Sequence, residues 1–226
     1  MSTAIERSTP GKRDDMLPNP SQNRPILAPY VPDVFLVAQR DKKQSGCLNM
    51  KPAQTVPATM RVLAIDPSLR GTGYAILEKN GGKLRAIEYG VIRNGDKLLP
   101  SSCLVAIHDR VAELIRQHEP ECAAVEGVIY VQSHRIAITL GAARGAAILA
   151  LAERGLPVYE YAPRRVKQAV VGRGAAAKTQ VAFMVRARLG LTESPQADAA
   201  DALAIGLTHF QAHETASHGA AVLVRV

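Results

Sequence analysis

Four acidic residues stand in apolar surroundings along this chain, and their types and spacing suit a metal ion. Asp66 and Glu126 each end a short apolar run that we predict to be a buried strand. Asp198 and Asp201 are three residues apart in an alanine-rich segment, so on a helix they share one face. Carboxylate oxygens and water are the ligands that Mg²⁺ prefers. The four residues therefore predict a magnesium site where two strand ends meet one helix.

Each acid also has a structural explanation that the sequence alone leaves open. Asp66 precedes Pro67 and could cap a turn, and Glu126 could be a solvated strand end. Asp198 could interact with the positive end of the helix dipole, although this explains Asp201 less well. A shared cation is the one explanation that accounts for all four acids together.

The chemistry expected of such a site is the hydrolysis of a phosphodiester. Two Mg²⁺ ions about 4 Å apart can activate a water molecule and stabilise the leaving oxygen. We expect two ions per subunit, with Mn²⁺ able to substitute. The formal net charge of +8 fits a polyanionic partner. Aromatic residues make up only 4% of the chain, which argues against a protein that stacks many single-stranded bases.

Positive side chains gather close after the last predicted strand, near the same sheet edge. Glycines at 172 and 174 would let the backbone approach a phosphate there. Any one of these charges could be an exposed, solvated group, but as a set they predict contacts with DNA phosphates. The set comprises Arg164, Arg165, Lys167, Arg173 and Lys178.

The elements that must position these groups follow from the apolar patterns. Strands are predicted over 62–65, 72–77, 83–92, 123–126 and 156–161. Helices are predicted over 101–118, 133–154, 164–170, 178–189 and 194–213, the last with Ser194 as its N-cap. Short turns join the first three strands into an antiparallel meander, and helices lead to the other two, which should run parallel to the first. The predicted fold class is α/β, with a mixed five-stranded sheet flanked by helices.

The composition divides the chain into three parts. Residues 1–59 carry eight of the 14 prolines, so we predict a disordered, Pro-rich N-terminal extension. Either Met60 is the biological start, or the extension is a basic tail that adds loose contacts to nucleic acid. Residues 60–213 are predicted to form the nuclease domain and 214–226 a C-terminal tail. No long uninterrupted apolar run predicts a membrane span, and three cysteines without pairing or zinc spacing indicate a reducing, cytoplasmic location.

Five segments of the sequence, taken together, resemble the RuvC family of Holliday junction resolvases. They read AIDPSLRGTGY from 64, AVEGV from 124, LGAARG from 140, YEYAP from 159 followed by VKQ, and QADAADALA from 196. The resemblance implies an RNase H-like fold, a homodimer and Mg²⁺-dependent, symmetric nicking of a four-way DNA junction in recombination and repair. It also implies that Asp66, Glu126, Asp198 and Asp201 are the catalytic metal ligands. Lys167 and Lys178 match family positions implicated in catalysis and DNA binding, and a branch-migration helicase complex is an expected partner.

The resemblance also bears on the residues after Glu126 and on two glycines of the helix over 133–154. Some family members carry a phenylalanine three residues after the matching glutamate, thought to stack on junction bases. Ile129 stands at that place here, and either Ile129 or the adjacent Tyr130 is expected to contact the junction bases. Gly141 and Gly145 give the helix over 133–154 a small face, which suits packing on the sheet or a dimer contact. The resemblance favours the dimer.

Other readings of the sequence remain open at this stage. Residues 66–73 also resemble a phosphate loop of actin-like ATPases, although those proteins need a second lobe that the chain lacks. A non-catalytic junction-binding protein and an RNase H acting on RNA–DNA hybrids are further alternatives. His209, His213 and His218 are expected at the surface.

Overall fold

The computed structural model describes residues 59–128, 133–217 and 225. The strands are β1 (Thr59–Asp66), β2 (Gly71–Asn80), β3 (Lys83–Arg93), β4 (Cys122–Glu126) and β5 (Val158–Tyr161). The helices are α1 (Pro100–His118), α2 (His134–Ala152), α3 (Pro163–Val171), α4 (Lys178–Leu189) and α5 (Ala197–Ser217). Every predicted strand and helix is present, and most bounds differ by one to three residues.

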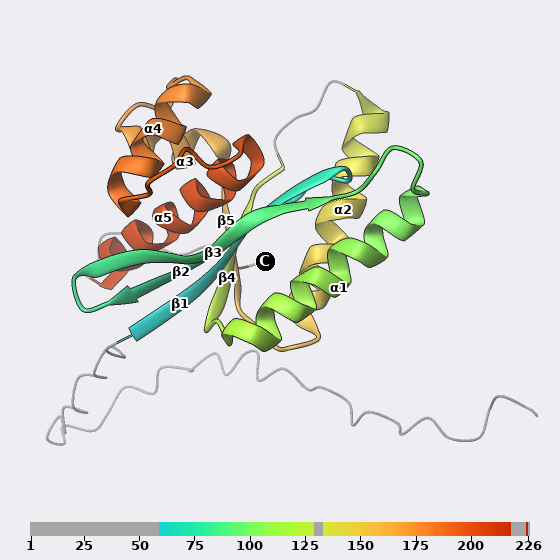
Figure 1. Cartoon of the computed structure of the whole chain (residues 1–226), viewed down its shortest axis with the longest axis horizontal. Coiled ribbons are helices and arrows are strands. Elements are labelled where there is room, and N and C mark those ends of the chain that lie inside the picture. The colour runs from blue at the N-terminus through green and yellow to red at the C-terminus, as the bar shows by residue number, and fades with distance from the viewer. Residues whose placement is uncertain (1–58, 129–132, 218–224, 226) are drawn as a thin grey trace, which may run out of the picture. The chain divides into compact units, whose positions relative to one another are not determined.

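The strands form one mixed sheet in the order β3-β2-β1-β4-β5. β2 pairs antiparallel with both β1 and β3, whereas β4 runs parallel to β1 and β5 runs parallel to β4. Helices α1 and α2 cover one face of the sheet, and α3, α4 and α5 cover the other (Figure 1). The predicted fold class, an RNase H-like mixed sheet flanked by helices, is confirmed.

The alternation of side chains along β1 determines on which face of the sheet its terminal acid, Asp66, lies. Val62 and Ala64 belong to the apolar core beneath α3, α4 and α5. Leu63 and Ile65 belong to the core beneath α1 and α2. Because successive strand residues point to opposite faces, Asp66 falls on the face covered by α5. The same alternation in β4 places Glu126 on that face, so both strand-end acids face the helix that carries the other two.

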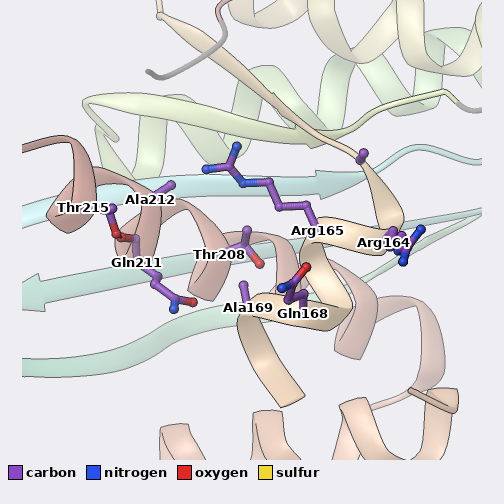
Figure 2. Close-up of a pocket in the computed structure, with 9 residues that line it drawn as sticks. Arg164, Arg165, Gln168, Ala169, Thr208, Gln211, Ala212 and Thr215 are labelled. Atoms are coloured by element: carbon purple, nitrogen blue, oxygen red, sulfur yellow. The ribbon is translucent and has the colours of Figure 1, made fainter. Parts of the chain in front are cut away.

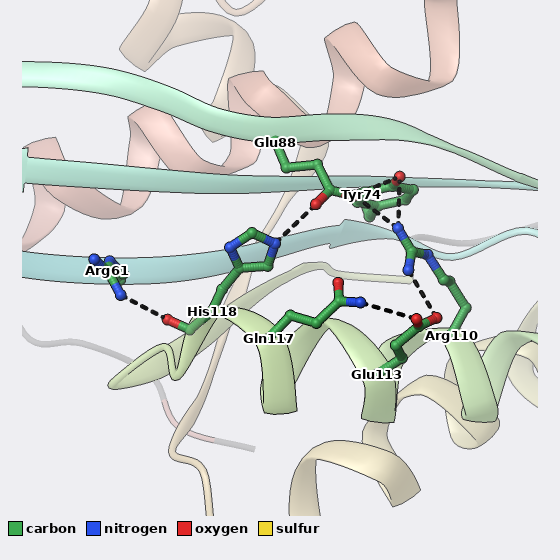
Figure 3. Close-up of polar contacts among 7 residues, drawn as sticks. All are labelled: Arg61, Tyr74, Glu88, Arg110, Glu113, Gln117 and His118. Carbon is green, nitrogen blue, oxygen red and sulfur yellow. Dashed lines mark hydrogen bonds and ion pairs between the residues drawn. The ribbon is translucent and has the colours of Figure 1, made fainter.

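A polar network joins α1 to the sheet on the opposite face (Figure 3). The carboxylate of Glu88 on β3 accepts hydrogen bonds from Tyr74 Oη at 3.1 Å and from Arg110 Nη2 at 2.7 Å. Its other oxygen lies 2.8 Å from His118 Nε2. Although partial burial raises the pKa of Glu88, these hydrogen bonds and the positive charge of Arg110 lower it overall. The network fixes α1 over the meander.

Helix α5 begins later and ends later than predicted. Its first helical residue is Ala197 rather than a residue next to Ser194, and it extends to Ser217, past residue 213. The backbone amide of Ala200 donates to the carbonyl of Gln196 at 2.8 Å. The Gln196 side chain in turn accepts from Arg93 Nη2 at 2.7 Å. The residue before the helix is thus bonded to the end of β3. No local capping signal in the sequence indicates this contact.

The expectation that His209 lies at the surface is wrong. Its side chain is fully buried between α5 and the parallel strands. Nδ1 lies 2.9 Å from Tyr161 Oη, and Nε2 lies 3.4 Å from Cys122 Sγ. Burial, together with nearby His213, lowers the pKa of His209 to about 4, so the ring is neutral at physiological pH. His213 is half-buried.

Several predictions fall outside the described residues. They are the N-terminal extension up to residue 58, the junction contacts of Ile129 and Tyr130, the position of His218, and most of the C-terminal tail. Of the described helices, α2 alone is long and apolar enough, by length and composition, to cross a membrane. In this fold, however, α2 packs against the sheet and α1 through Ala143, Ala147, Ala150 and Leu151.

Candidate active site

The ends of β1 and β4 and the first two turns of α5 meet at one cavity of about 200 Å³. Parallel pairing of β1 with β4 brings their carboxyl ends to the same edge, as the sequence predicted. The charged side chains that line the cavity are Asp66, Glu126, Asp201, Lys167 and Lys178. Three of the four predicted acids therefore share one cavity with the two predicted lysines.

The two strand-end carboxyls are hard to ionise together. Burial raises the pKa of Asp66 to about 8, with further contributions from the negative charges of Glu126 and Asp201. Burial, followed by repulsion from Asp201, also raises the pKa of Glu126. Lys178 opposes both shifts. Burial and mutual repulsion of this kind are what a divalent cation between the carboxylates would offset.

Lys178 supplies a positive charge to this acidic edge. Its Nζ lies 3.0 Å from Oδ2 of Asp201, with the lysine side chain 78% exposed and the aspartate 26% exposed. The hydrogen bond to Asp201 is the largest cause of a raised pKa for Lys178. Because the lysine is the first residue of α4 and mostly exposed, it can leave the carboxylate without disturbing the core.

Asp198 stands apart from the other three acids. It does not line the cavity, and its carboxylate lies against β2, where a Cβ added to Gly71 would be 2.9 Å from Oδ2. In the described part of the chain, no three acidic, histidine or cysteine side chains are arranged to hold one ion. The donor set still fits Mg²⁺ in kind, because it offers partly buried carboxylates with an excess of negative charge. The four acids do not yet surround one point, because Asp201 is paired with Lys178 and the carboxylate of Asp198 lies against Gly71.

The three predicted arginines do not line the cavity that holds the acids. Arg164 and Arg165 line a separate open cavity of about 570 Å³ between α3 and the later turns of α5 (Figure 2). Arg165 also lies over the ring of Tyr161, 5.7 Å from its centroid. Arg173 is exposed in the loop after α3. Of the five basic residues predicted to contact DNA phosphates, the fold thus brings Lys167 and Lys178 to the acids and leaves the three arginines outside that cavity.

Comparison with known proteins places this site in a family. The family described as crossover junction endodeoxyribonuclease RuvC matches residues 62–209. The chain belongs to the RuvC family. The RuvC of Akkermansia muciniphila is 54% identical over 160 residues, which are 70% of this chain and 96% of that protein. The RuvC of Edwardsiella ictaluri is 46% identical over 155 residues, 69% of this chain and 89% of that protein.

A solved RuvC structure agrees with the sequence match. The RuvC of T. thermophilus in complex with a Holliday junction substrate has a TM-score of 0.66 and 38% identity to this chain. The superposition covers 73% of this chain and 99% of that one. The RuvC match includes the four acids and both lysines. It favours the nuclease over the actin-like ATPase that the loop after β1 suggested.

Sequence reasoning missed two residues beside the RuvC site. Arg144 on α2 forms an ion pair with Glu160 on β5. Arg144 also lines a second, smaller cavity of about 130 Å³ that Asp66 and Glu126 share. An arginine in the middle of α2, with small and apolar residues on either side, is a signal that could have pointed to it. The partner, on a strand 16 positions away, could not have been chosen from the sequence.

The glycines predicted for a dimer contact point outward in this RuvC fold. Gly141 and Gly145 are exposed, and a Cβ added to either would meet no described atom within 4 Å. The buried side of α2 consists of other residues. Packing of these glycines on the sheet, the alternative raised by the sequence, is therefore wrong.

Proposed function

We propose that this chain is a Mg²⁺-dependent nuclease that resolves four-way DNA junctions by paired, symmetric nicking during recombination and repair. The observation that carries the proposal is the cavity where Asp66, Glu126 and Asp201 meet Lys167 and Lys178. The RuvC family assigns the substrate class, and metal dependence goes with that family. We propose Mg²⁺, two ions per subunit, with Mn²⁺ as a substitute.

The carboxylates would hold the metal, and the lysines would hold the DNA. Asp66, Glu126 and Asp201 are already together, and Asp198 would join them by turning away from Gly71. Bound Mg²⁺ would supply positive charge for the negative oxygens of the reacting phosphate. A divalent cation would also release Lys178 from Asp201 to contact a phosphate.

The proposed reaction is hydrolysis with an in-line displacement at phosphorus. A water oxygen forms the new bond to phosphorus, and the bond from phosphorus to the 3′-oxygen breaks. The products are a 5′-phosphate and a 3′-hydroxyl, which a ligase can seal. The proton that the attacking water loses passes to the solvent.

The exposed face of α2 supports a homodimer. Its apolar residues recur at intervals of four and three, which is the spacing of a helix–helix seam. Ile138 is 73% exposed and Leu149 is 54% exposed, with small residues between them. The seam consists of Ile138, Ala142, Gly145, Leu149 and Ala152, with Gly141 beside it. A two-fold dimer through this seam suits a junction with two equivalent cleavage points.

Four wider proposals accompany the proposed activity. The nuclease acts in the cytoplasm, and a branch-migration helicase complex delivers the junction to it. The domain over 60–213 carries the activity, with residues 1–59 as an extension. The basic pocket between α3 and α5 contributes DNA contacts through Arg164 and Arg165, and Arg173 adds a further contact from its loop.

The test is cleavage of a synthetic four-way junction by the full chain in Mg²⁺. Wild type should give paired, ligatable nicks, and Asp66→Asn should bind the junction without cutting it. Asp96→Asn, at an exposed loop position, is the matched control and should cut like wild type. Cutting by Asp66→Asn at the wild-type rate would remove the carboxylate from the mechanism. Preference for an RNA–DNA hybrid duplex would instead support an RNase H.

A further inference from the structure

An ion pair next to the active site joins helix α2 to strand β5 of the sheet. Nη2 of Arg144 on α2 contacts Oε2 of Glu160 on β5. The arginine side chain is 17% exposed and the glutamate side chain is 35% exposed. A partly buried charge pair of this kind is expensive to break, because removing one partner leaves the other charge without compensation.

The glutamate of this pair packs directly against the residue that follows Glu126. A Cβ added to Gly127 would lie 2.7 Å from Oε1 of Glu160 and 3.1 Å from its Cγ. The Gly127 amide also donates to the carbonyl of Tyr161, one residue beyond Glu160, at 2.9 Å. Glu160 thus occupies the space that a side chain at 127 would need. Two contacts with β5 therefore hold the end of β4: the hydrogen bond to Tyr161 and the packing of the Glu160 side chain.

Arg144 also lines a cavity that two of the catalytic carboxyls line. The cavity of about 130 Å³ next to the active site is lined by Arg144 together with Asp66 and Glu126. The Nε of Arg144 is buried there without a hydrogen-bond partner among the described residues. Leaving such a donor unpaired destabilises the folded protein. A guanidinium kept at this position despite that cost is not explained by stabilisation of the fold alone.

We infer that Arg144 is a positioning residue for Glu126, and that it acts through Glu160 and Gly127. With the arginine in place, Glu160 is neutralised and the strand end that carries Glu126 is held against β5. Without it, Glu160 becomes an unpaired carboxylate beside two acids that already repel each other. Glu160 would then move toward solvent, and the strand end beside it would lose its support. This inference rests on the proposed nuclease activity.

The first experiment compares Arg144→Met, Arg144→Lys and Arg154→Met in the full chain. Arg154, exposed in the turn after α2, is the matched charge-removal control. At saturating protein, Arg144→Met should slow single-turnover cleavage by about 10- to 100-fold, as expected when a reacting group is misplaced by up to 1 Å. Junction affinity in EDTA should stay within about twofold, because the defect lies in the cleavage step. Arg144→Lys should recover part of the rate, and Arg154→Met should match wild type.

A second experiment follows the path through Gly127. Gly127→Ala places a methyl group where Glu160 lies, so it should slow cleavage as Arg144→Met does. Combining the two changes should cost no more than the larger single effect, since both break one connection. The Mg²⁺-induced rise in melting temperature, measured without DNA, should shrink in both variants. If Arg144→Met does not fold, Glu160→Gln, which keeps the shape of the glutamate, takes its place.

The outcomes separate this inference from the proposed function. If wild type cuts the junction and Arg144→Met cuts it equally fast, the positioning role is wrong. A rate loss matched by a lower melting temperature, with no recovery in Arg144→Lys, means that the pair is only a structural tie, which also overturns the inference. If wild type itself cuts no four-way junction in Mg²⁺, the proposed function fails.

Discussion

Gly73 of β2 lies where the first turn of α5 meets the sheet, directly across the β1–β2 ladder from Asp66. A Cβ added to Gly73 would lie 2.0 Å from the carbonyl oxygen of Asp198 and 2.6 Å from its carbonyl carbon. Both atoms belong to the helix backbone, so no side chain can rotate away. Restoring an ordinary contact of 3.4 Å would require α5 to move by about 1.4 Å. Asp198 and Asp201 would move with it.

Gly73→Ala should therefore damage both activity and stability. A displacement near 1 Å at a reacting centre can cost about 100-fold in rate, and overpacking of this kind costs about 1–3 kcal/mol. The measurements are single-turnover cleavage of a four-way junction in Mg²⁺ and thermal unfolding followed by circular dichroism.

The matched control is Gly82→Ala, in the hairpin that β2 forms with β3. A Cβ there would meet no described atom within 4 Å, so this variant should cut and melt like wild type. A Gly73→Ala variant with the wild-type rate and melting temperature would contradict this prediction. The first turn of α5 would then not be seated on β2.

Three further predictions concern the dimer, the α1 network and the acidic edge. Leu149→Asp places a charge in the exposed seam of α2, so it should give monomers in sedimentation and single nicks in place of paired ones. Glu88→Gln should lower the free energy of unfolding by about 1–2 kcal/mol at neutral pH, because it weakens charge-assisted hydrogen bonds that are partly exposed to solvent. Since the pKa of Glu88 is lowered by folding, this difference should fade in urea titrations as the pH falls below about 4.5, the ordinary value for glutamate. In EDTA, Asp66→Asn should melt at a higher temperature than wild type, and the gain should grow from pH 4 to pH 8. Folding raises the pKa of Asp66 to about 8, so as the pH rises the Asp66 carboxyl loses its proton in the unfolded chain before it does in the folded one. The free energy of unfolding of wild type therefore falls between pH 4 and pH 8. The fall is at most about 1.4 kcal/mol per unit of pKa shift.

The order of elements and most of their bounds could be predicted because they depend on local patterns. Apolar runs ending in Asp66 and Glu126 place both acids at strand ends wherever the strands lie. The connection between the strands, through a helix, requires parallel pairing, and parallel pairing brings both ends to one edge. The three-residue spacing of Asp198 and Asp201 likewise holds on any helix. Because β1 and β4 are neighbours in the sheet, three of the four predicted acids meet as these patterns indicate.

The errors lie where a residue's role depends on distant partners. His209 has the polarity of a surface residue, but Tyr161 and Cys122 provide partners in the core, so burial costs it little. Ser194 has the right type for a helix N-cap, yet α5 starts three residues later, where its first turn meets β2. Asp198 shares a helix with Asp201, but its carboxylate lies against Gly71 rather than in the cavity.

The amino-acid sequence alone identifies the chemistry available to this protein, which depends on four acids and two lysines. Residue type and periodicity suffice for that, because they act over a few neighbouring positions. Which charges pair depends on the three-dimensional packing of the elements. This packing joined Lys178 to Asp201 and Arg144 to Glu160, and it turned the seam of α2 outward. These outcomes depend on packing between segments far apart in the chain, where differences of about 1 Å determine whether two groups touch.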